Sequence, residues 1–222
     1  MRVPDVSRAV EEIAAIHAHL DAREIYRGWR SIPVALSGLV GIGVALLLTT
    51  QQTHSGNLSP GISVPAADAW TFLRTWFAVG TAAMVAGCAE IAWHYTRHAS
   101  GHERRRTRVV MGQILPALMA GVVVPLALVR LNPEFVVAAP GLWALCFGLG
   151  IVSARACLPP ASVWAAAYYM TAGVLLLVIA GPGVPAPWTV GATFGVGQGL
   201  VAILLHATLE RGPSPREDAD VR

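Results

Sequence analysis

The chain has 222 residues, of which 55% are hydrophobic and only 13% are charged, and its net charge is +3. Soluble domains carry about 25% charged residues, so this composition excludes an ordinary soluble globular protein. All sixteen basic residues are arginines, which favours membrane orientation and contact with anionic lipid headgroups over binding of nucleic acid.

Residues 5–29 are predicted to form an amphipathic helix. Asp5 and Ser7 are candidate N-caps, and apolar residues recur at helical spacing along one side. The pattern fits a helix that lies on the inner membrane surface or packs on its own domain, and it also fits a helix paired with a partner. We therefore assign residues 1–30 to a cytoplasmic helix. No cleavable signal peptide is expected, because the first apolar run starts only near Ile32.

Apolar runs recur along residues 31–209, each near the roughly 20 residues that a helix needs to cross a bilayer. The predicted spans are Ile32–Thr50, Ala69–Trp93, Val109–Val129, Phe135–Ala154, Ala161–Ala180 and Trp188–Leu209. The sequence thus predicts an all-α polytopic membrane protein with six transmembrane helices. Residues 210–222 are charged and are predicted to form a disordered cytoplasmic tail.

The arginines predict the orientation of these spans. Five of them lie between the second and third spans, and positive charge near span ends marks the cytoplasmic side. With six spans, all arginines except Arg74 and Arg130 fall on that side. Both termini are therefore predicted to be cytoplasmic.

Two pairs of ionisable residues lie near the inner ends of predicted spans, Glu90 with His94 and His206 with Glu210. Each pair is spaced i, i+4, so its side chains share one helix face. A charge at the centre of a membrane helix costs about 2.5–3.5 kcal/mol, which favours a functional role. If the second and sixth spans touch, the four groups could relay protons, bind a divalent metal or ligate a haem. The simpler interpretation is that only Glu90 lies a full turn inside the membrane and the other three reach water.

Small and amide residues predict helix packing. Gly191, Gly195 and Gly199 recur every four residues in the sixth span, and such a ridge lets another helix approach closely, within this domain or in a homodimer. Gln113 and Gln198 are predicted to hydrogen-bond between helices. The three cysteines form no C-x-x-C pair and are expected to be reduced, buried thiols.

Three short stretches at the two ends of the membrane domain are similar to a known group of proteins. They are Leu36-Ser37-Gly38-Leu39-Val40-Gly41-Ile42, Phe194-Gly195-Val196 and Leu209-Glu210-Arg211. In these stretches the chain resembles an uncharacterised group of small bacterial six-span integral membrane proteins. Gln198 stands where that group is expected to have a histidine, so a shared ligand at this position is not implied. The resemblance implies a bacterial membrane protein with a sensing or regulatory role, because genes of the group accompany winged-helix regulators.

No nucleophile elbow, Walker motif or H-E-x-x-H motif occurs in the sequence, so no catalytic residue, metal or cofactor is assigned. We expect a non-enzymatic, multi-pass protein of the bacterial inner membrane. It would be a subunit or regulatory component that works through contacts with other membrane helices, in a homo-oligomer or a membrane complex. Two alternatives stay open, a small proton-coupled transporter that uses Glu90 and a haem- or metal-binding protein built on His94 and His206. Membrane lipids are expected partners, and nucleic acid is not.

Overall fold

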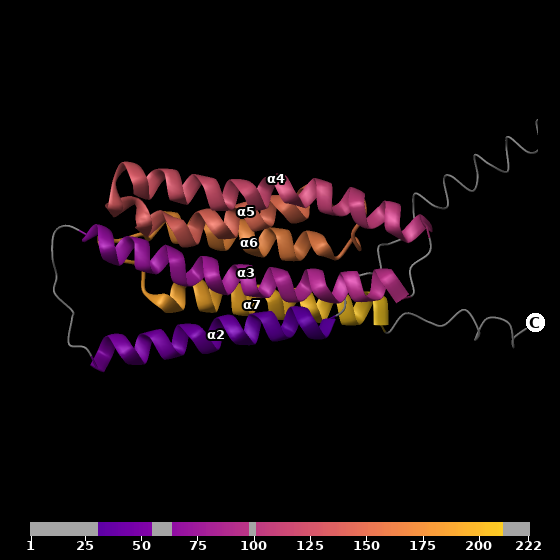
Figure 1. Cartoon of the computed structure of the whole chain (residues 1–222), viewed down its shortest axis with the longest axis horizontal. Helices are drawn as coiled ribbons and strands as arrows, with labels where there is room; N and C mark the ends of the chain where they lie inside the picture. The colour runs from indigo at the N-terminus through magenta and orange to yellow at the C-terminus, as the bar shows by residue number, and fades with distance from the viewer. Residues whose placement is uncertain (1–30, 55–63, 98–100, 211–222) are drawn as a thin grey trace, which may run out of the picture.

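A computed structural model describes residues 31–54, 64–97 and 101–210, and every regular element in these ranges is a helix (Figure 1). The elements are α2 (Ser31–His54), α3 (Ala66–Arg97), α4 (Gly101–Leu131), the 3-10 helix η1 (Pro133–Ala138), α5 (Ala139–Ser153), α6 (Ser162–Val178), α7 (Pro187–Leu205) and the π-helix η2 (His206–Glu210). The all-α prediction is confirmed. The predicted amphipathic helix at 5–29 lies outside the described residues, as does the predicted tail at 210–222 apart from Glu210, which ends η2.

Five of these segments are long and apolar enough to cross a membrane, which is the architecture of a multi-pass membrane protein. They are Ser31–Gln51, Ala66–Glu90, Arg108–Leu131, Pro133–Ser153 and Pro187–Thr208. The remaining predicted span corresponds to α6, which is apolar but has only 17 residues. At 1.5 Å per residue it extends about 26 Å, slightly less than the roughly 30 Å hydrocarbon core of a bilayer.

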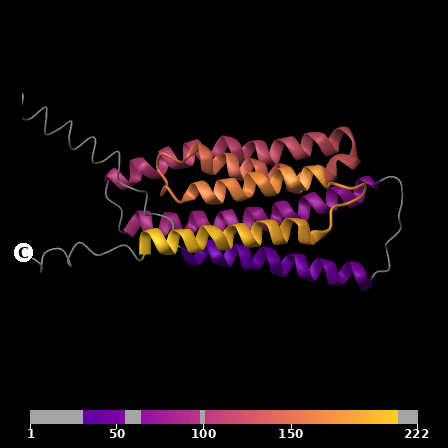
Figure 2. The same ribbon diagram turned by 180° about the vertical axis from the view of Figure 1, so that it is seen from behind.

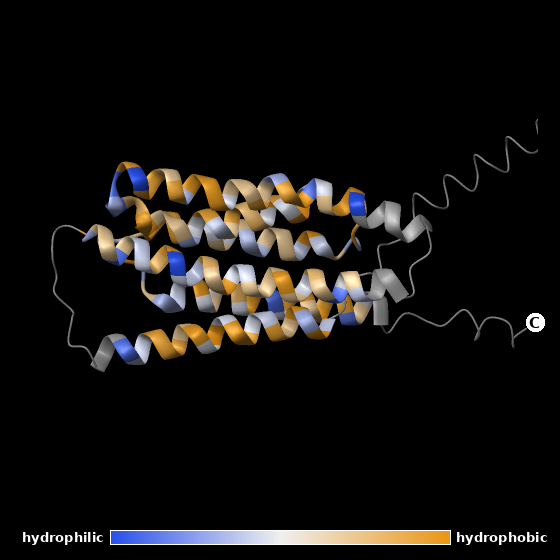
Figure 3. Ribbon diagram, viewed as in Figure 1, coloured by the Kyte–Doolittle hydropathy of each residue, from blue (hydrophilic) through white to orange (hydrophobic). Residues whose placement is uncertain are grey.

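The helices lie side by side along the long axis of the molecule (Figures 1 and 2). Apolar residues dominate the middle of the bundle, and the most hydrophilic residues lie mainly towards helix ends (Figure 3). We call the end that holds the start of α4 and the end of α7 the arginine end. The most extensive packing joins α2 to α7, followed by α5 to α6 and α4 to α5.

The arginine run, the five arginines from Arg97 to Arg108 between the second and third predicted spans, lies in helices that extend beyond those spans. α3 continues past Trp93 to Arg97, and α4 begins at Gly101 rather than at Val109. Arginine and glutamate are good helix formers, and loss of hydropathy ends a membrane span without ending the helix that contains it. The connection between α3 and α4 is therefore confined to residues 98–100, which lie outside the described residues.

The fourth predicted span also starts differently, with the 3-10 helix η1 before α5. Asn132 caps η1, because its side-chain oxygen accepts a hydrogen bond from the backbone N–H of Glu134 at 3.0 Å. Pro133 stands at the first position, where its missing N–H costs little. This arrangement reverses the chain within a short turn after α4 ends at Leu131.

Two clusters of buried apolar residues hold the bundle together. The cluster far from the arginine end joins α2, α3, α4, η1, α5 and α7, and contains Ala45, Ala69, Phe72, Leu73, Trp76, Val129, Val136, Ala139 and Val190. The cluster nearer the arginine end joins α4, α5, α6, α7 and the α5–α6 turn, and contains Val110, Ile114, Ala144, Ile151, Ala154, Leu158, Ala165, Ala166, Tyr169, Val201 and Leu205. The described side chains of α3 contribute to the first of these clusters and not to the second.

Candidate functional site

The two pairs of ionisable residues are only partly within the described structure. Glu90 is half-buried on α3, and His206 is exposed at the start of η2. The side chains of His94 and Glu210 lie outside the described part of the structure. Helix α3 packs mainly on α2, α4 and η1, whereas α7 packs on α2, α5 and α6. Convergence of the four groups therefore stays a prediction. Among the described side chains, no group of three His, Cys, Asp or Glu could hold a metal ion.

Of the three glycines in the predicted ridge of the last span, two pack closely against another helix and one does not. A Cβ atom at Gly191 would overlap the Cβ of Ala45 and would lie 3.0 Å from the carbonyl oxygen of Gly41. A Cβ atom at Gly195 would overlap the side chain of Ile42. A Cβ atom at Gly199 would meet no described atom within 4 Å. The structure thus uses two of the three glycines for close packing of α7 on α2.

The two glutamines lie in different settings. Gln198 is half-buried at the junction of α2 and α7, where its Cβ would lie 2.9 Å from a Cβ added at Gly38. Gln113 is half-buried on α4, and its Oε1 is buried and has no hydrogen-bond partner among the described residues. The predicted interhelical hydrogen bond is therefore not made by Oε1 of Gln113.

A second close crossing, between α5 and α6, was not predicted from the sequence. A Cβ at Gly141 would lie 2.8 Å from the carbonyl oxygen of Gly173, and a Cβ at Gly173 would lie 2.8 Å from the carbonyl oxygen of Gly141. One turn before Gly173 in α6, Tyr169 is fully buried with its ring against Gly197 of α7. Single glycines in separate spans form no repeat, so no sequence pattern marked these contacts.

The candidate binding surface lies on α3. Phe72 and Trp76 are buried, and Gly80, Ala83, Gly87 and Glu90 continue the same side of the helix at spacings of three and four. We call these last four residues the α3 face. A Cβ at Gly80 or at Gly87 would meet no described atom within 4 Å. Gly80 is exposed, whereas Ala83, Gly87 and Glu90 are half-buried, so the α3 face continues the buried side of the helix without close packing at its two glycines.

Burial along α3 changes sharply where this face begins. Leu73 is fully buried and Trp76 is 6% exposed, whereas no described residue of α3 beyond Val79 belongs to either buried cluster. The indole Nε1 of Trp76, one turn before Gly80, is buried and has no hydrogen-bond partner among the described residues. Gly80, Ala83 and Gly87 together form a surface of small residues suited to close approach of another helix.

No protein-family model, curated protein or solved structure matches the chain. The function is therefore inferred from the membrane architecture and the α3 face.

Proposed function

We propose that this protein is a non-enzymatic subunit or regulatory component of a membrane complex, and that its α3 face binds a transmembrane helix of another polypeptide. The observation that carries the proposal is the open space beside Gly80 and Gly87, on the side of α3 that is buried earlier in the helix at Phe72 and Trp76. Apolar surface alone does not drive helix association in lipid, because acyl chains are equally apolar. Association depends instead on close packing of small residues and on polar contacts, and the α3 face supplies both.

Glu90 strengthens this interpretation. A carboxylate that faces acyl chains is costly, by about 2.5–3.5 kcal/mol at mid-membrane and less towards an interface. Glu90 lies on the α3 face, one turn beyond Gly87, so a partner helix on the two glycines would also cover the carboxylate. A hydrogen-bond donor on that helix would offset the cost.

The proposal predicts a specific photo-crosslink. A diazirine amino acid at Ala83, which is half-buried on the α3 face, is expected to form an adduct with a membrane helix when native membranes are irradiated. The adduct will be heavier than the 23.4 kDa chain, and mass spectrometry of its peptides will identify a second copy or another membrane protein. Gly87→Leu, which fills the open space, should abolish the adduct and also remove the partner from the native mass of the complex.

The control places the same amino acid at Ala167, an exposed alanine on α6, where only lipid adducts are expected. Lipid adducts alone at Ala83 would contradict the proposal. An adduct between Ala83 and α2 or α7 of the same chain would also contradict it. That result would mean that α3 closes on its own bundle, as a transporter that uses Glu90 would require.

The proposal includes six spans with both termini in the cytoplasm of a bacterial cell. Support comes from Arg108 and Arg155 at the arginine end, and from the position of α6, which connects the α5–α6 turn at that end to the start of α7 at the opposite end (Figure 1). Alkaline phosphatase fused after Gly183 is expected to be active, and the same enzyme fused after Arg155 or at the C-terminus is expected to be inactive. Equal activity at Gly183 and Arg155 would show that α6 does not cross the membrane.

A further inference from the structure

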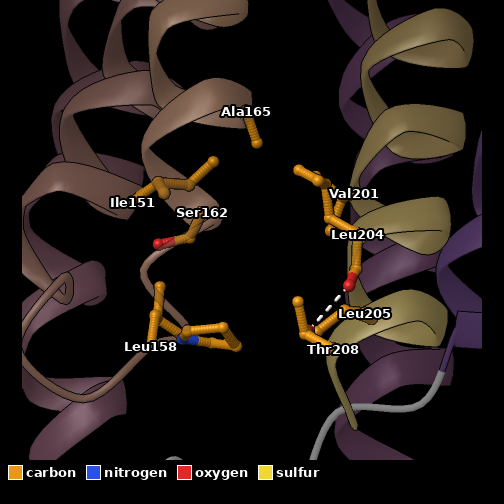
Figure 4. Close-up of a pocket in the computed structure, with 9 residues that line it drawn as sticks. Ile151, Leu158, Ser162, Ala165, Val201, Leu204, Leu205 and Thr208 are labelled. Carbon is orange, nitrogen blue, oxygen red and sulfur yellow. Dashed lines mark hydrogen bonds between the residues drawn. The ribbon is translucent and has the colours of Figure 1, made fainter. Parts of the chain in front are cut away.

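Several serine and threonine hydroxyls in the bundle donate to a carbonyl of their own helix. Thr208, for example, donates to the carbonyl oxygen of Leu204, one turn earlier, at 2.7 Å (Figure 4). A carbonyl inside a helix already accepts a backbone N–H from the next turn, so such a hydroxyl only adds a second bond. Trp143 and Tyr168 differ, because each donates to a carbonyl of another helix.

The carbonyl that Trp143 reaches has lost its backbone donor. The indole Nε1 of Trp143, on α5, donates to the carbonyl oxygen of Gly121, on α4, at 2.9 Å. In a regular α-helix this oxygen would accept the N–H of residue 125, which here is a proline and has none. Gly121 is buried and Pro125 is fully buried, so the indole is the donor that replaces the missing N–H.

Close packing of α4 on α5 makes this bond possible. A Cβ atom at Gly121 would lie 3.3 Å from the Cβ of Cys146 and 3.9 Å from Cδ1 of Trp143. A larger residue at this position would therefore push α5 away from the free carbonyl. The glycine and the proline, one turn apart on α4, form one site that Trp143 occupies.

The same indole ring also contacts α3. It stacks on Phe72, with ring centroids 6.1 Å apart and planes 7° apart, and Phe77 packs on it at 5.4 Å and 66°. Phe77 lies just before Val79, beyond which no described residue of α3 belongs to a buried cluster. The direction of the rest of α3 is therefore set by the contacts that the helix makes up to this point.

We propose that Trp143 couples the conformation of α4 to the orientation of α3. Its N–H closes the gap that Pro125 leaves in the hydrogen bonding of α4, and this bond fixes the indole ring against which α3 packs. An unpaired carbonyl in the membrane has no water to bond, so losing this donor costs more than losing a second bond elsewhere. When the bond breaks, α4 can bend further at Pro125 and α3 can tilt. This coupling depends on the fold and not on the proposed partner helix.

The first test is a double-mutant cycle, measured by chemical denaturation of the full-length protein in mixed micelles. Trp143→Phe removes the N–H and is expected to raise the unfolding equilibrium constant about tenfold. With Pro125→Ala, the alanine N–H can bond Gly121, and the same substitution should raise the constant by no more than about threefold. Pro116→Ala, at the exposed proline of α4, should leave the tenfold effect unchanged. An effect of Trp143→Phe that is the same with and without Pro125 would overturn the proposal.

Tyr168 supplies a matched control. Its hydroxyl also bonds between helices, to the carbonyl oxygen of Thr193 at 3.0 Å, but Gly197 has an N–H for that carbonyl one turn later. Tyr168→Phe is therefore expected to raise the unfolding equilibrium constant only about threefold, with Pro125 or with alanine there. If Pro125→Ala reduces the effect of Tyr168→Phe as well, the rescue is not specific to Trp143 and the proposal fails.

The second test measures the orientation of α3 by double electron–electron resonance. Nitroxide labels are placed at Cys88, exposed on α3, and at Ala167→Cys, exposed on α6, with the other two cysteines replaced by alanine. Trp143→Phe is expected to broaden the distance distribution. Benzothienylalanine at position 143 keeps the shape of the indole but has no N–H, and it should broaden the distribution too; it also replaces Trp143→Phe if that variant loses helix. A distribution that stays narrow with benzothienylalanine would mean that ring volume alone positions α3, and would overturn the coupling.

Discussion

Gly191→Ala is expected to lower the free energy of unfolding by about 1–3 kcal/mol, the usual cost of forcing extra volume into a packed interface. The added Cβ would overlap the Cβ of Ala45 and approach the carbonyl oxygen of Gly41 to 3.0 Å. Neither atom belongs to the free end of a flexible side chain, so a rotamer change cannot relieve the clash. Helices α2 and α7 would have to separate, and they form the most extensive pair in the bundle.

The matched control for this variant is Gly199→Ala, two turns further along α7. A Cβ there would meet no described atom within 4 Å, and alanine favours helix over glycine by up to about 1 kcal/mol. Thermal unfolding in detergent, followed by far-UV circular dichroism, should therefore show a lower midpoint for Gly191→Ala alone. If the two variants unfold at the same temperature, the close contact between α2 and α7 is not formed in the protein.

Gly173→Ala is the second substitution with a large expected effect, again a loss of about 1–3 kcal/mol. Its Cβ would lie 2.8 Å from the carbonyl oxygen of Gly141 and 2.9 Å from the backbone nitrogen of Leu145. Both are backbone atoms of α5, so the helices must move apart. Because α6 has only 17 residues, it depends heavily on this crossing for its position, and we expect the variant to lose tertiary packing near Tyr169 as well.

The control for Gly173→Ala is Gly87→Ala on the α3 face. Gly87 is half-buried like many interior positions, but a Cβ there would meet no described atom within 4 Å. Chemical denaturation in mixed micelles should show destabilisation for Gly173→Ala and unchanged or higher stability for Gly87→Ala in the isolated chain. Strong destabilisation by Gly87→Ala would show that α3 packs on its own bundle, and would remove the basis for the proposed partner site.

Helix boundaries were predicted well where hydropathy governs them and less well elsewhere. The first predicted span, Ile32–Thr50, falls within α2, and the last one starts one residue after α7 does. The extensions of α3 and α4 through the arginine run were missed, because hydropathy marks where a helix leaves the hydrocarbon and not where it ends. The 3-10 start of the fourth span was missed for a similar reason, since η1 depends on the cap at Asn132.

For the candidate site, composition identified residue types but not their neighbours. The ridge at Gly191 and Gly195 was recognised from its four-residue repeat, yet the same repeat at Gly199 lies beside open space. The α3 face was not recognised, because Gly80, Ala83 and Gly87 are spaced by three and four among many other alanines. Its significance comes from the contrast with Trp76, which is buried on the same side of the helix.

The sequence by itself determined that this chain is an all-α membrane protein, because runs of apolar residues leave helices as the structure that satisfies every backbone hydrogen bond in lipid. It also predicted which ends of the helices carry arginine. Tertiary structure alone decided which helices are in contact, which glycines leave no room for a Cβ atom, and which face of α3 is not closely packed. Packing between apolar helices depends on the shapes of their surfaces rather than on hydropathy. The hydropathy of the residues along the chain says little about those shapes.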